Sequence, residues 1–511
     1  MKKFFTILLT IILCVSICGC QASTTLDKNL TSSLNQQEAM VMGTFYRNTM
    51  NADIASDDAQ VKVVDAEADE LIKTVEDFPD SLKATNKTYY LSATGSDSNN
   101  GTSSSTPKRT YADLQDSLTS GDVVLFNRGD IFREQIEVVS GVSYGAYGTG
   151  IKPRIYGSVD GMTGIWEQTT VPGVYRFTKL IGYYSNIVFN NGQYVGKYVS
   201  DLGDITKQEL NVYIQSANNY LYLYCPQGHP QDVFNSIEIV DNVDGTNGSI
   251  FLPDDTDASN GYRTDNVTFQ NLCVMYSGTH CIAPGASSNV KIEGCVLGFA
   301  GAKGIFNAST AAPVGNAIEF WGAANNVEVS NNYIFQCFDT GITHQGEWGN
   351  NPSYFNNVTY QNNLIEYCVW AIESWYSNGN GEATENNINI LNNIVRYSGY
   401  GWGSLNRHDK HSYSDISYST GAHSNSITIS GNTFDRSRAI SLGFSNPPEA
   451  SKMILSNNKF LVTKNTKISH VDKVDKDNSQ GYIRYIYKYG ENQSNLDNLY
   501  THSNNQFIKV K

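Results

Sequence analysis

Charged residues are scarce in this sequence, and basic residues are scarcer than acidic ones. Asp, Glu, Lys and Arg make up 17% of the 511 residues, and the formal net charge is -14. Aromatic residues make up 12%, with 32 tyrosines. Disordered chains are rich in charge and poor in aromatics, and nucleic-acid-binding domains carry basic surfaces, so the composition excludes both classes. A polyanionic ligand would need a local cationic site or a metal, because the net charge of the chain repels it.

Several catalytic signatures are also missing. The sequence contains no glycine-rich phosphate loop, no nucleophile elbow, no HExxH motif and no CxxC pair. These motifs supply phosphate cradles, activated serines and zinc ligands, so the corresponding chemistries have no support here.

What the sequence does contain is a repeat between residues 266 and 432. Each copy begins with Asn and then alternates apolar and polar residues, which is the pattern of a strand with one buried face. The copies begin 23 to 38 residues apart, at Asn266, Asn289, Asn326, Asn357, Asn387 and Asn425. Recurrence at this spacing indicates a solenoid, whose repeats bury their apolar faces by stacking on their neighbours.

The segments between the copies indicate which solenoid this is. No helix-period segment of useful length lies there. A second short strand follows each Asn-Asn pair (333–335, 364–366, 394–396), and a third follows it (341–343, 371–373, 401–403). Three strands per coil predict a parallel β-helix. Asn suits its tight turns because it tolerates the left-handed conformation and can bond to an Asn one rung away.

This repeat resembles the right-handed parallel β-helix proteins of the pectate-lyase-like superfamily, in which asparagine ladders are common. The resemblance covers roughly Thr88 to Phe460. It implies an all-β fold, an extracellular carbohydrate-active protein, and a substrate cleft along the sheet made by the third strands.

The start of the chain reads as a lipoprotein leader. Lys2-Lys3 precede an apolar run that is too short for a typical transmembrane helix, and residues 17–20 resemble a bacterial lipobox. We expect cleavage after residue 19, lipidation of Cys20 and anchoring on the extracellular face of the membrane, or secretion if the lipobox is not used. Palmitate would be among the attached lipids.

The sequence pattern divides the rest of the chain into five expected segments. We expect a tether and an N-terminal helix capping the open end of the solenoid (20–85), first coils (86–165), an inserted antiparallel β subdomain (166–240), the main β-helix (241–460) and a C-terminal cap (461–511). The aspartates after the insert (241, 244, 254, 255 and 257) favour a solvated loop over a calcium site.

Six cysteines follow residue 224. Cys273 and Cys295 take matching places in successive repeats, as do Cys337 and Cys368. A ladder of buried thiols is the favoured interpretation, and disulfides remain the alternative because adjacent rungs lie about 4.8 Å apart.

Candidate site residues gather in the third strands and their loops. Glu319 and Glu373 should point outward from flanking isoleucines, in one column and two rungs apart, with Asp339 in reserve. A pair at this spacing favours an inverting glycoside hydrolase, which needs no cofactor. Aromatic rings and amides could hold the sugar: Trp321, Trp348, Trp375, Trp402, Gln345 and Asn406.

Two alternatives stay open. Arg407 or Lys410, with His344 and His408 nearby, could form the base of a uronate lyase or C5-epimerase, with Ca²⁺ neutralising the uronate carboxylate. A non-catalytic adhesin or glycan-binding protein is the other, because a fold does not by itself give a function. The expected partner is a polysaccharide rather than nucleic acid, and the expected state is a monomer.

Overall fold

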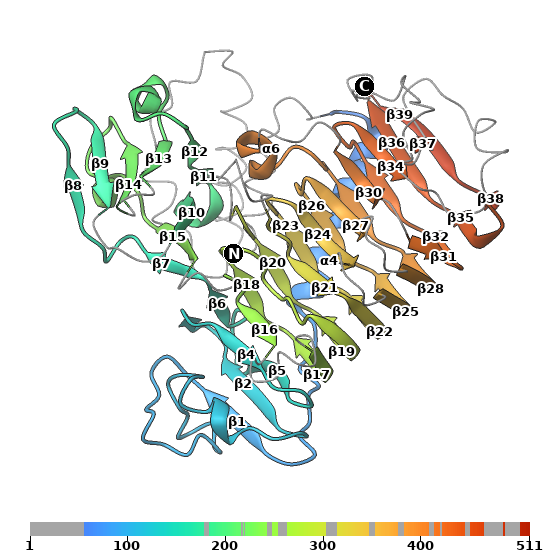
Figure 1. Cartoon of the computed structure of the whole chain (residues 1–511), viewed down its shortest axis with the longest axis horizontal. Helices are drawn as coiled ribbons and strands as arrows, with labels where there is room; N and C mark the ends of the chain where they lie inside the picture. Colours follow the sequence, from blue (N-terminus) through green and yellow to red (C-terminus); the bar gives the residue numbers. More distant parts are fainter. Residues whose placement is uncertain are drawn as a thin grey trace, which may run out of the picture. The chain divides into compact units, whose positions relative to one another are not determined.

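The computed structural model describes residues 56–177, 183–215, 218, 220–242, 248–253, 263–302, 314–346, 353–376, 383–407, 413–419, 422–444, 450–463, 484–485 and 501–510. Within these ranges, three parallel sheets run side by side and make a right-handed parallel β-helix (Figure 1). The predicted fold is therefore confirmed. The leader, Cys20 and the aspartates 244, 254, 255 and 257 lie outside the described residues. No helix in the described ranges is long and apolar enough to span a membrane.

The first sheet, sheet A, contains the strand of each repeat that begins with Asn. It has 12 strands. In order they are β1 (Thr88–Leu91), β2 (Val123–Asn127), β5 (Ser143–Tyr147), β17 (Arg263–Gln270), β19 (Ala286–Glu293), β22 (Ala323–Ser330), β25 (Ser353–Gln361), β28 (Ala383–Leu391), β32 (Ile427–Ser430), β35 (Met453–Ser456) and β38 (Thr501–Ser503), with β31 (Ala422–Ser424) beside β28.

The second sheet, sheet B, follows a tight turn after each sheet-A strand and has 10 strands. They are β3 (Ile131–Phe132), β6 (Arg154–Tyr156), β18 (Cys273–Met275), β20 (Val296–Gly298), β23 (Tyr333–Phe335), β26 (Leu364–Glu366), β29 (Ile394–Arg396), β33 (Thr433–Asp435), β36 (Lys459–Thr463) and β39 (Gln506–Val510).

The third sheet, sheet C, has six strands. It contains β21 (Ile318–Trp321), β24 (Thr340–Gly346), β27 (Trp370–Tyr376), β30 (Ser414–Ser419) and β34 (Ile440–Phe444) in parallel, with β37 (Arg484–Tyr485) antiparallel at the edge. Ile282 continues the stack by bridging Ile318 to Phe251 of β16 (Phe251–Pro253), which pairs with β4 (Ile136–Val138).

Asparagines hold the turns between sheets A and B. Asn331, Asn362 and Asn392 have φ between 53° and 57°, the left-handed conformation that Asn tolerates. The next residue in these coils is a buried Asn, and five of these side-chain amides donate in series to the Asn one rung on, at 3.0 to 3.1 Å, along 332, 363, 393, 432, 458 and 505. The predicted asparagine ladder is confirmed.

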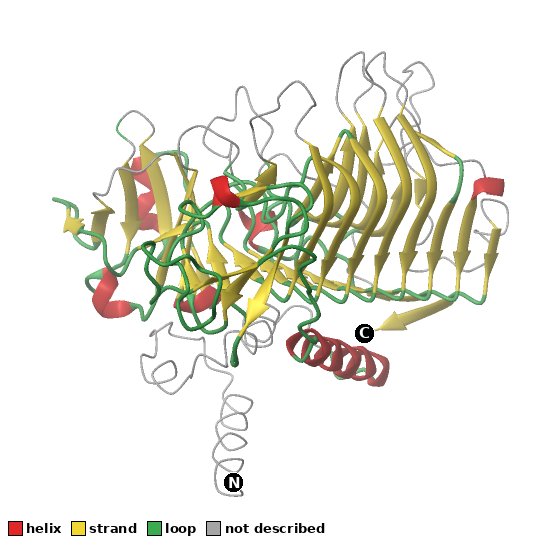
Figure 2. Cartoon of the chain, turned by 90° about the horizontal axis from the view of Figure 1, so that it is seen from below, coloured by secondary structure: helices red, strands yellow, loops and turns green. Residues whose placement is uncertain are grey.

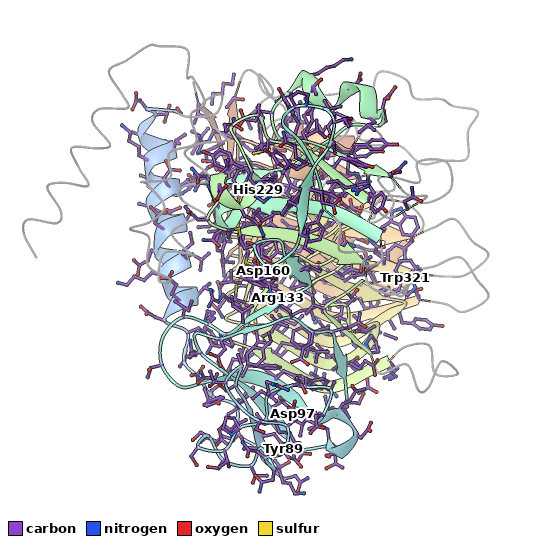
Figure 3. The ribbon with its side chains drawn as sticks, turned by 90° about the vertical axis from the view of Figure 1, so that its left-hand side faces the viewer. Tyr89, Asp97, Arg133, Asp160, His229 and Trp321 are labelled. Atoms are coloured by element: carbon purple, nitrogen blue, oxygen red, sulfur yellow. The ribbon has the colours of Figure 1, made fainter. Side chains whose placement is uncertain are left out.

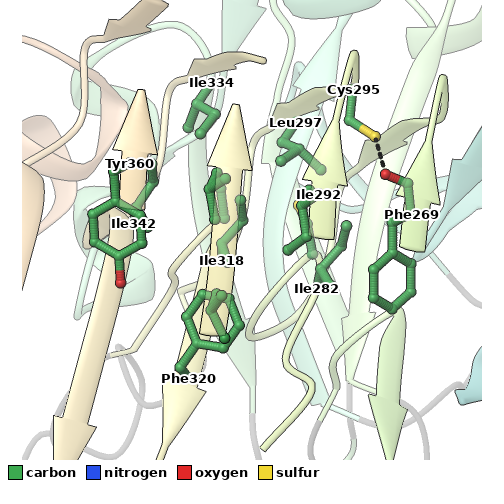
Figure 4. Packing of buried hydrophobic residues seen from close by; sticks show 14 of the residues in the cluster. Phe269, Ile282, Ile292, Cys295, Leu297, Ile318, Phe320, Ile334, Ile342 and Tyr360 are labelled. Atoms are coloured by element: carbon green, nitrogen blue, oxygen red, sulfur yellow. Dashed lines mark hydrogen bonds between the residues drawn. The ribbon is translucent and has the colours of Figure 1, made fainter. Parts of the chain in front are cut away.

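The interior of the β-helix is an apolar stack. Isoleucines 282, 318, 342, 372 and 416 pair rung by rung along sheet C and are fully buried. They meet the inner side chains of sheets A and B, such as Ile292 and Ile334 (Figure 4). Cys281, Cys295, Cys337 and Cys368 belong to the same cluster, and all six described cysteines are free and buried.

The predicted matching of cysteines in successive repeats is confirmed for one pair and wrong for the other. Cys337 and Cys368 contact each other in the core, as their matching positions predict. Cys273, however, pairs with Val296 rather than Cys295. A shift of one residue turns a side chain to the other face of a strand, so Cys295 packs inside the β-helix while Cys273 packs outside it. Burial raises the pKa of Cys295 to about 11 and that of Cys273 to about 12.

The N-terminal helix does not cap the end of the solenoid as expected. α4 (Ala59–Glu76) contacts β23, β26 and β33, so it lies along the outer face of sheet B (Figure 2). Its buried stripe of Val61, Val64, Ala68, Ile72 and Val75 covers the apolar side chains of that face. The helix thus protects a side of the solenoid.

A second correction concerns residues 401–403, which were expected to form a third strand. They belong to the start of a short helix, α6 (Trp402–Asn406), and β30 takes the strand position instead. Trp402 is 1% exposed, packs on Phe338 and donates its indole N–H to the carbonyl of Gln336. The large ring fills a gap beside sheet B and cannot also follow the Ile342–Ile372 column.

Apart from one short parallel pair, Lys197–Tyr198 with Asn211–Val212, the inserted subdomain is antiparallel, as predicted. One sheet joins β12 (Lys197–Tyr198), β13 (Asn211–Gln215), β14 (Tyr220–Tyr224), β9 (Val174–Phe177) and β8 (Trp166–Gln168). Another joins β11 (Tyr194–Val195), β10 (Tyr183–Phe189), β15 (Ile237–Asn242) and β7 (Ser158–Asp160).

Two polar contacts fix the insert to the β-helix. Arg133, which follows β3, makes a bidentate bond to the buried Glu238 of β15, at 2.6 and 2.9 Å. At the other end, the Asn406 side chain of α6 accepts from the backbone N–H of Tyr198 at 2.9 Å. Figure 3 places Arg133 close to Asp160.

Candidate active site

Two glutamates stand in one column on the outer face of sheet C. Glu319 of β21 pairs with Thr343 of β24, which pairs with Glu373 of β27. Ile318 and Phe320, the neighbours of Glu319, point into the core (Figure 4), so Glu319 points the other way. The predicted register therefore holds, and the two backbones are about 10 Å apart at two rungs of about 4.8 Å.

A second column on the same face contains aromatic and amide side chains. Trp321 pairs with Gln345, and Gln345 pairs with Trp375. Each lies two residues beyond a member of the first column and so shares its face of the sheet. All three are half-buried, and Trp321 lies on the side of the molecule away from α4 (Figure 3). Two indoles thus flank the carboxylates, with an amide between them.

The Glu319 carboxylate is paired with a histidine that the sequence did not single out as its partner. His280 donates from Nε2 to Glu319, because its Nδ1 accepts from the backbone N–H of Asn316 at 3.2 Å and so carries no proton. The sequence offered one indication that His280 lies near this site. His280 stands two residues before Ile282, which belongs to the isoleucine column of sheet C.

The Glu373 carboxylate accepts hydrogen bonds from neutral side chains. Thr340 Oγ1 and Gln345 Nε2 both donate to its Oε2 at 3.2 Å. Asn316 joins the two carboxylates indirectly, because its Oδ1 accepts from the backbone N–H of Thr340 at 3.0 Å. One buried asparagine therefore orders the partners of both glutamates.

A hydroxyl lies between the two carboxylates. Thr343 is fully buried, and its Oγ1 makes no hydrogen bond within the described part of the chain. Glu319 and Glu373 are only 7% and 6% exposed. Carboxylates at this depth interact strongly with any charge that forms beside them, because the local dielectric is low.

Asp339 and Arg407 form an ion pair at the start of sheet C. Arg407 Nη1 donates to Asp339 Oδ1 at 2.5 Å, and the guanidinium lies 5.5 Å from the centre of the Trp370 ring. The guanidinium also lies 5.4 Å from the Phe338 ring. An arginine side chain has five N–H donors and no acceptor for a further proton. Asp339 in turn is engaged by this cation.

Other predicted site residues lie elsewhere. His344 was expected in a loop near the glutamates, but it belongs to β24 and points into the solenoid, where Nε2 meets Glu385 at 2.9 Å and Nδ1 meets the Tyr360 hydroxyl at 3.0 Å. Asn406 is bonded to the insert, and Trp402 is in the core beside sheet B. His408, Lys410 and Trp348 lie outside the described residues.

The arrangement can perform acid–base chemistry on a ligand lying across sheet C. No cluster of three or more His, Cys, Asp or Glu side chains placed to hold a metal occurs among the described residues. The fold and the site together define the class: a right-handed parallel β-helix protein with an outward carboxylate pair beside an aromatic column.

The known proteins that resemble this chain do so at low identity. No protein-family model matches the chain, and no curated protein sequence does. Among solved structures, XylC in complex with xylose is 14% identical with a TM-score of 0.41, covering 75% of this chain and 76% of that one. Pectate lyase Pel9A is 10% identical with a TM-score of 0.41, covering 74% and 70%. The GH136 lacto-N-biosidase from Eubacterium ramulus is 12% identical with a TM-score of 0.37, covering 83% and 68%.

Proposed function

We propose that the protein is a polysaccharide-degrading glycoside hydrolase that works with Glu319 and Glu373. The observation that carries the proposal is their shared column, two rungs apart, beside the Trp321–Gln345–Trp375 column. The indoles supply apolar faces for sugar rings, and the amide supplies a hydrogen-bonding group between them. We place the enzyme on the outer face of the cell membrane, anchored through Cys20.

The hydrogen bonds favour one assignment of roles. Glu319, which accepts from the His280 N–H, is the base, and Glu373, which accepts from Thr340 and Gln345, is the acid. Glu373 gives its proton to the glycosidic oxygen, and the C1–O bond breaks with its electron pair going to that oxygen. Glu319 takes a proton from the water whose oxygen bonds to C1 from the opposite face. The Thr343 hydroxyl is placed to orient this water or a sugar hydroxyl.

The spacing predicts inversion at the anomeric carbon. Inverting enzymes hold their carboxyl groups about 6.5–9.5 Å apart, and retaining enzymes about 5–5.5 Å. Backbones about 10 Å apart leave the longer separation within reach of both side chains. Proton NMR during the first minutes of hydrolysis should show the product with the anomeric configuration opposite to that of the substrate. Initial retention of configuration would contradict the two-rung mechanism.

A uronate lyase receives less support from the structure. One of its two candidate bases, Arg407, is engaged by Asp339 at 2.5 Å and lies over the Phe338 and Trp370 rings, and the other, Lys410, lies outside the described residues. These contacts suit a residue that orders the start of the cleft rather than one that abstracts a proton.

A further inference from the structure

The five-stranded sheet of the insert has one buried and one open face. Phe177, Leu221, Leu223 and Val212 alternate along β9, β14 and β13 and are at most 5% exposed. The intervening residues lie on the other face. There, Glu167, Arg176, Tyr222 and Tyr213 stand directly opposite one another across four strands. We call this row, with Tyr220 beside it, the tyrosine face.

The members of the tyrosine face contact each other. The Tyr222 ring centre lies 6.1 Å from that of Tyr213 and 6.4 Å from that of Tyr220. The Arg176 guanidinium stacks 4.6 Å from the Tyr220 ring centre and forms an ion pair with Glu167. The rings are half-exposed and ordered by these contacts, and the paired Arg and Glu leave the row without net charge.

A cavity of about 560 Å³ opens on this face. Arg176 and Tyr222 form its floor, the 3₁₀ helix η4 (Leu202–Lys207) forms one wall, and the turn between β8 and β9 forms another. Val171 and Leu202, at its rim, are 44% and 39% exposed, which is unusual for large apolar side chains in this protein. The volume lies within the range of about 300–1,000 Å³ that is typical of small-ligand sites.

We propose that the tyrosine face and its cavity bind a neutral oligosaccharide, as an accessory site separate from sheet C. A sugar ring has an apolar face that packs on aromatic rings, and hydroxyls that bond to planar polar side chains. Tyrosines supply the first kind of contact, and Arg176, Glu167 and Gln168 supply the second. A purely apolar ligand would have to cover the charged Arg176–Glu167 pair, and an anion would compete with Glu167 for Arg176.

This inference rests on the proposed function for its class of ligand and extends it. A second site holds the enzyme on a polymer after the cleft releases its product, so its contribution appears on long substrates rather than short ones.

The test is a glycan array probed with the purified full-length protein in detergent. The array holds neutral and anionic oligosaccharides of plant, fungal, bacterial and mucosal origin. All chains carry Glu373→Gln to prevent turnover and Trp321→Ala with Trp375→Ala to remove the aromatic contacts of sheet C, with and without Tyr222→Ala or Arg176→Ala. The expected result is binding to neutral glycans that falls tenfold or more in both second-site variants. The matched control is Tyr354→Ala, which removes a 45% exposed tyrosine from sheet A.

Two outcomes overturn the accessory site: no neutral glycan is bound, or binding survives both Tyr222→Ala and Arg176→Ala. Tyr222→Phe, which keeps the ring, should bind like the parent, and its failure to do so would also count against stacking. Failure of the proposed function is seen separately. Chains with Glu373 intact should release reducing ends from short oligosaccharides whether or not Tyr222 is present.

Discussion

Replacing Glu373 by Gln should lower turnover by a factor of about 10²–10⁴ while leaving glycan binding and the melting temperature close to those of the parent protein. Gln has the size of Glu and can still accept from Thr340 Oγ1 and Gln345 Nε2, which bond to Glu373 at 3.2 Å. It cannot, however, deliver a proton to a leaving oxygen. Reducing-end assays under saturating substrate, with melting curves of both proteins, measure the two effects.

The matched control for this variant is Glu328→Gln. Glu328 lies on sheet A, where it accepts from Gln361 at 3.1 Å, and its loss should leave turnover unchanged. If Glu373→Gln turned over substrate at the parent rate, the carboxylate assignment would be wrong. A large fall in melting temperature would instead mean that Glu373 has a structural role.

The second large effect is on stability and concerns His344 and Glu385 inside the solenoid. Both are fully buried, and Glu385 Oε1 also accepts from the hydroxyls of Ser374 at 2.6 Å and Tyr376 at 3.1 Å. Removing one member of such a pair leaves the other buried without its hydrogen-bond partner. We expect Glu385→Leu to lower the free energy of unfolding by about 3–5 kcal/mol, measured by chemical denaturation.

A double variant separates this pairing from simple packing. The double variant, with His344→Leu and Glu385→Leu, no longer contains the unpaired buried imidazole. It should be more stable than Glu385→Leu alone. If the two losses simply added, the pair would contribute nothing beyond its separate contacts, and the buried network would not be the cooperative unit that its shared acceptor suggests.

The fold was predictable because its main signal is local and repeated. Alternating strands recur along the β-helix with Asn-Asn at several of the turns, and one conformation, the left-handed turn of Asn331, Asn362 and Asn392, accounts for this residue type. The position of α4 was not predictable in this way. An apolar stripe shows that a helix packs on something, but whether on an end or a side of the solenoid depends on tertiary contacts.

The site was predictable where its residues occupy equivalent positions in stacked repeats. The glutamate column and the Trp321–Gln345–Trp375 column follow from stacking equivalent strands. His344 was misplaced because the third strand was expected to end at residue 343. β24 continues to Gly346, so His344 turns inward, where it meets Glu385 of sheet A. The His280–Glu319 pair joins residues of different coils, and its one signal, the spacing of His280 from Ile282, does not show which carboxylate the histidine meets.

The most direct test of the account is a polysaccharide panel followed in two channels. One channel measures new reducing ends, and the other measures the ultraviolet absorbance of the unsaturated product that uronate elimination leaves. The account predicts reducing ends without absorbance on at least one neutral polysaccharide, and their loss in Glu373→Gln. Reducing ends accompanied by absorbance would contradict it and indicate a lyase. No signal in either channel, with glycan binding retained, would contradict catalysis and indicate a glycan-binding β-helix.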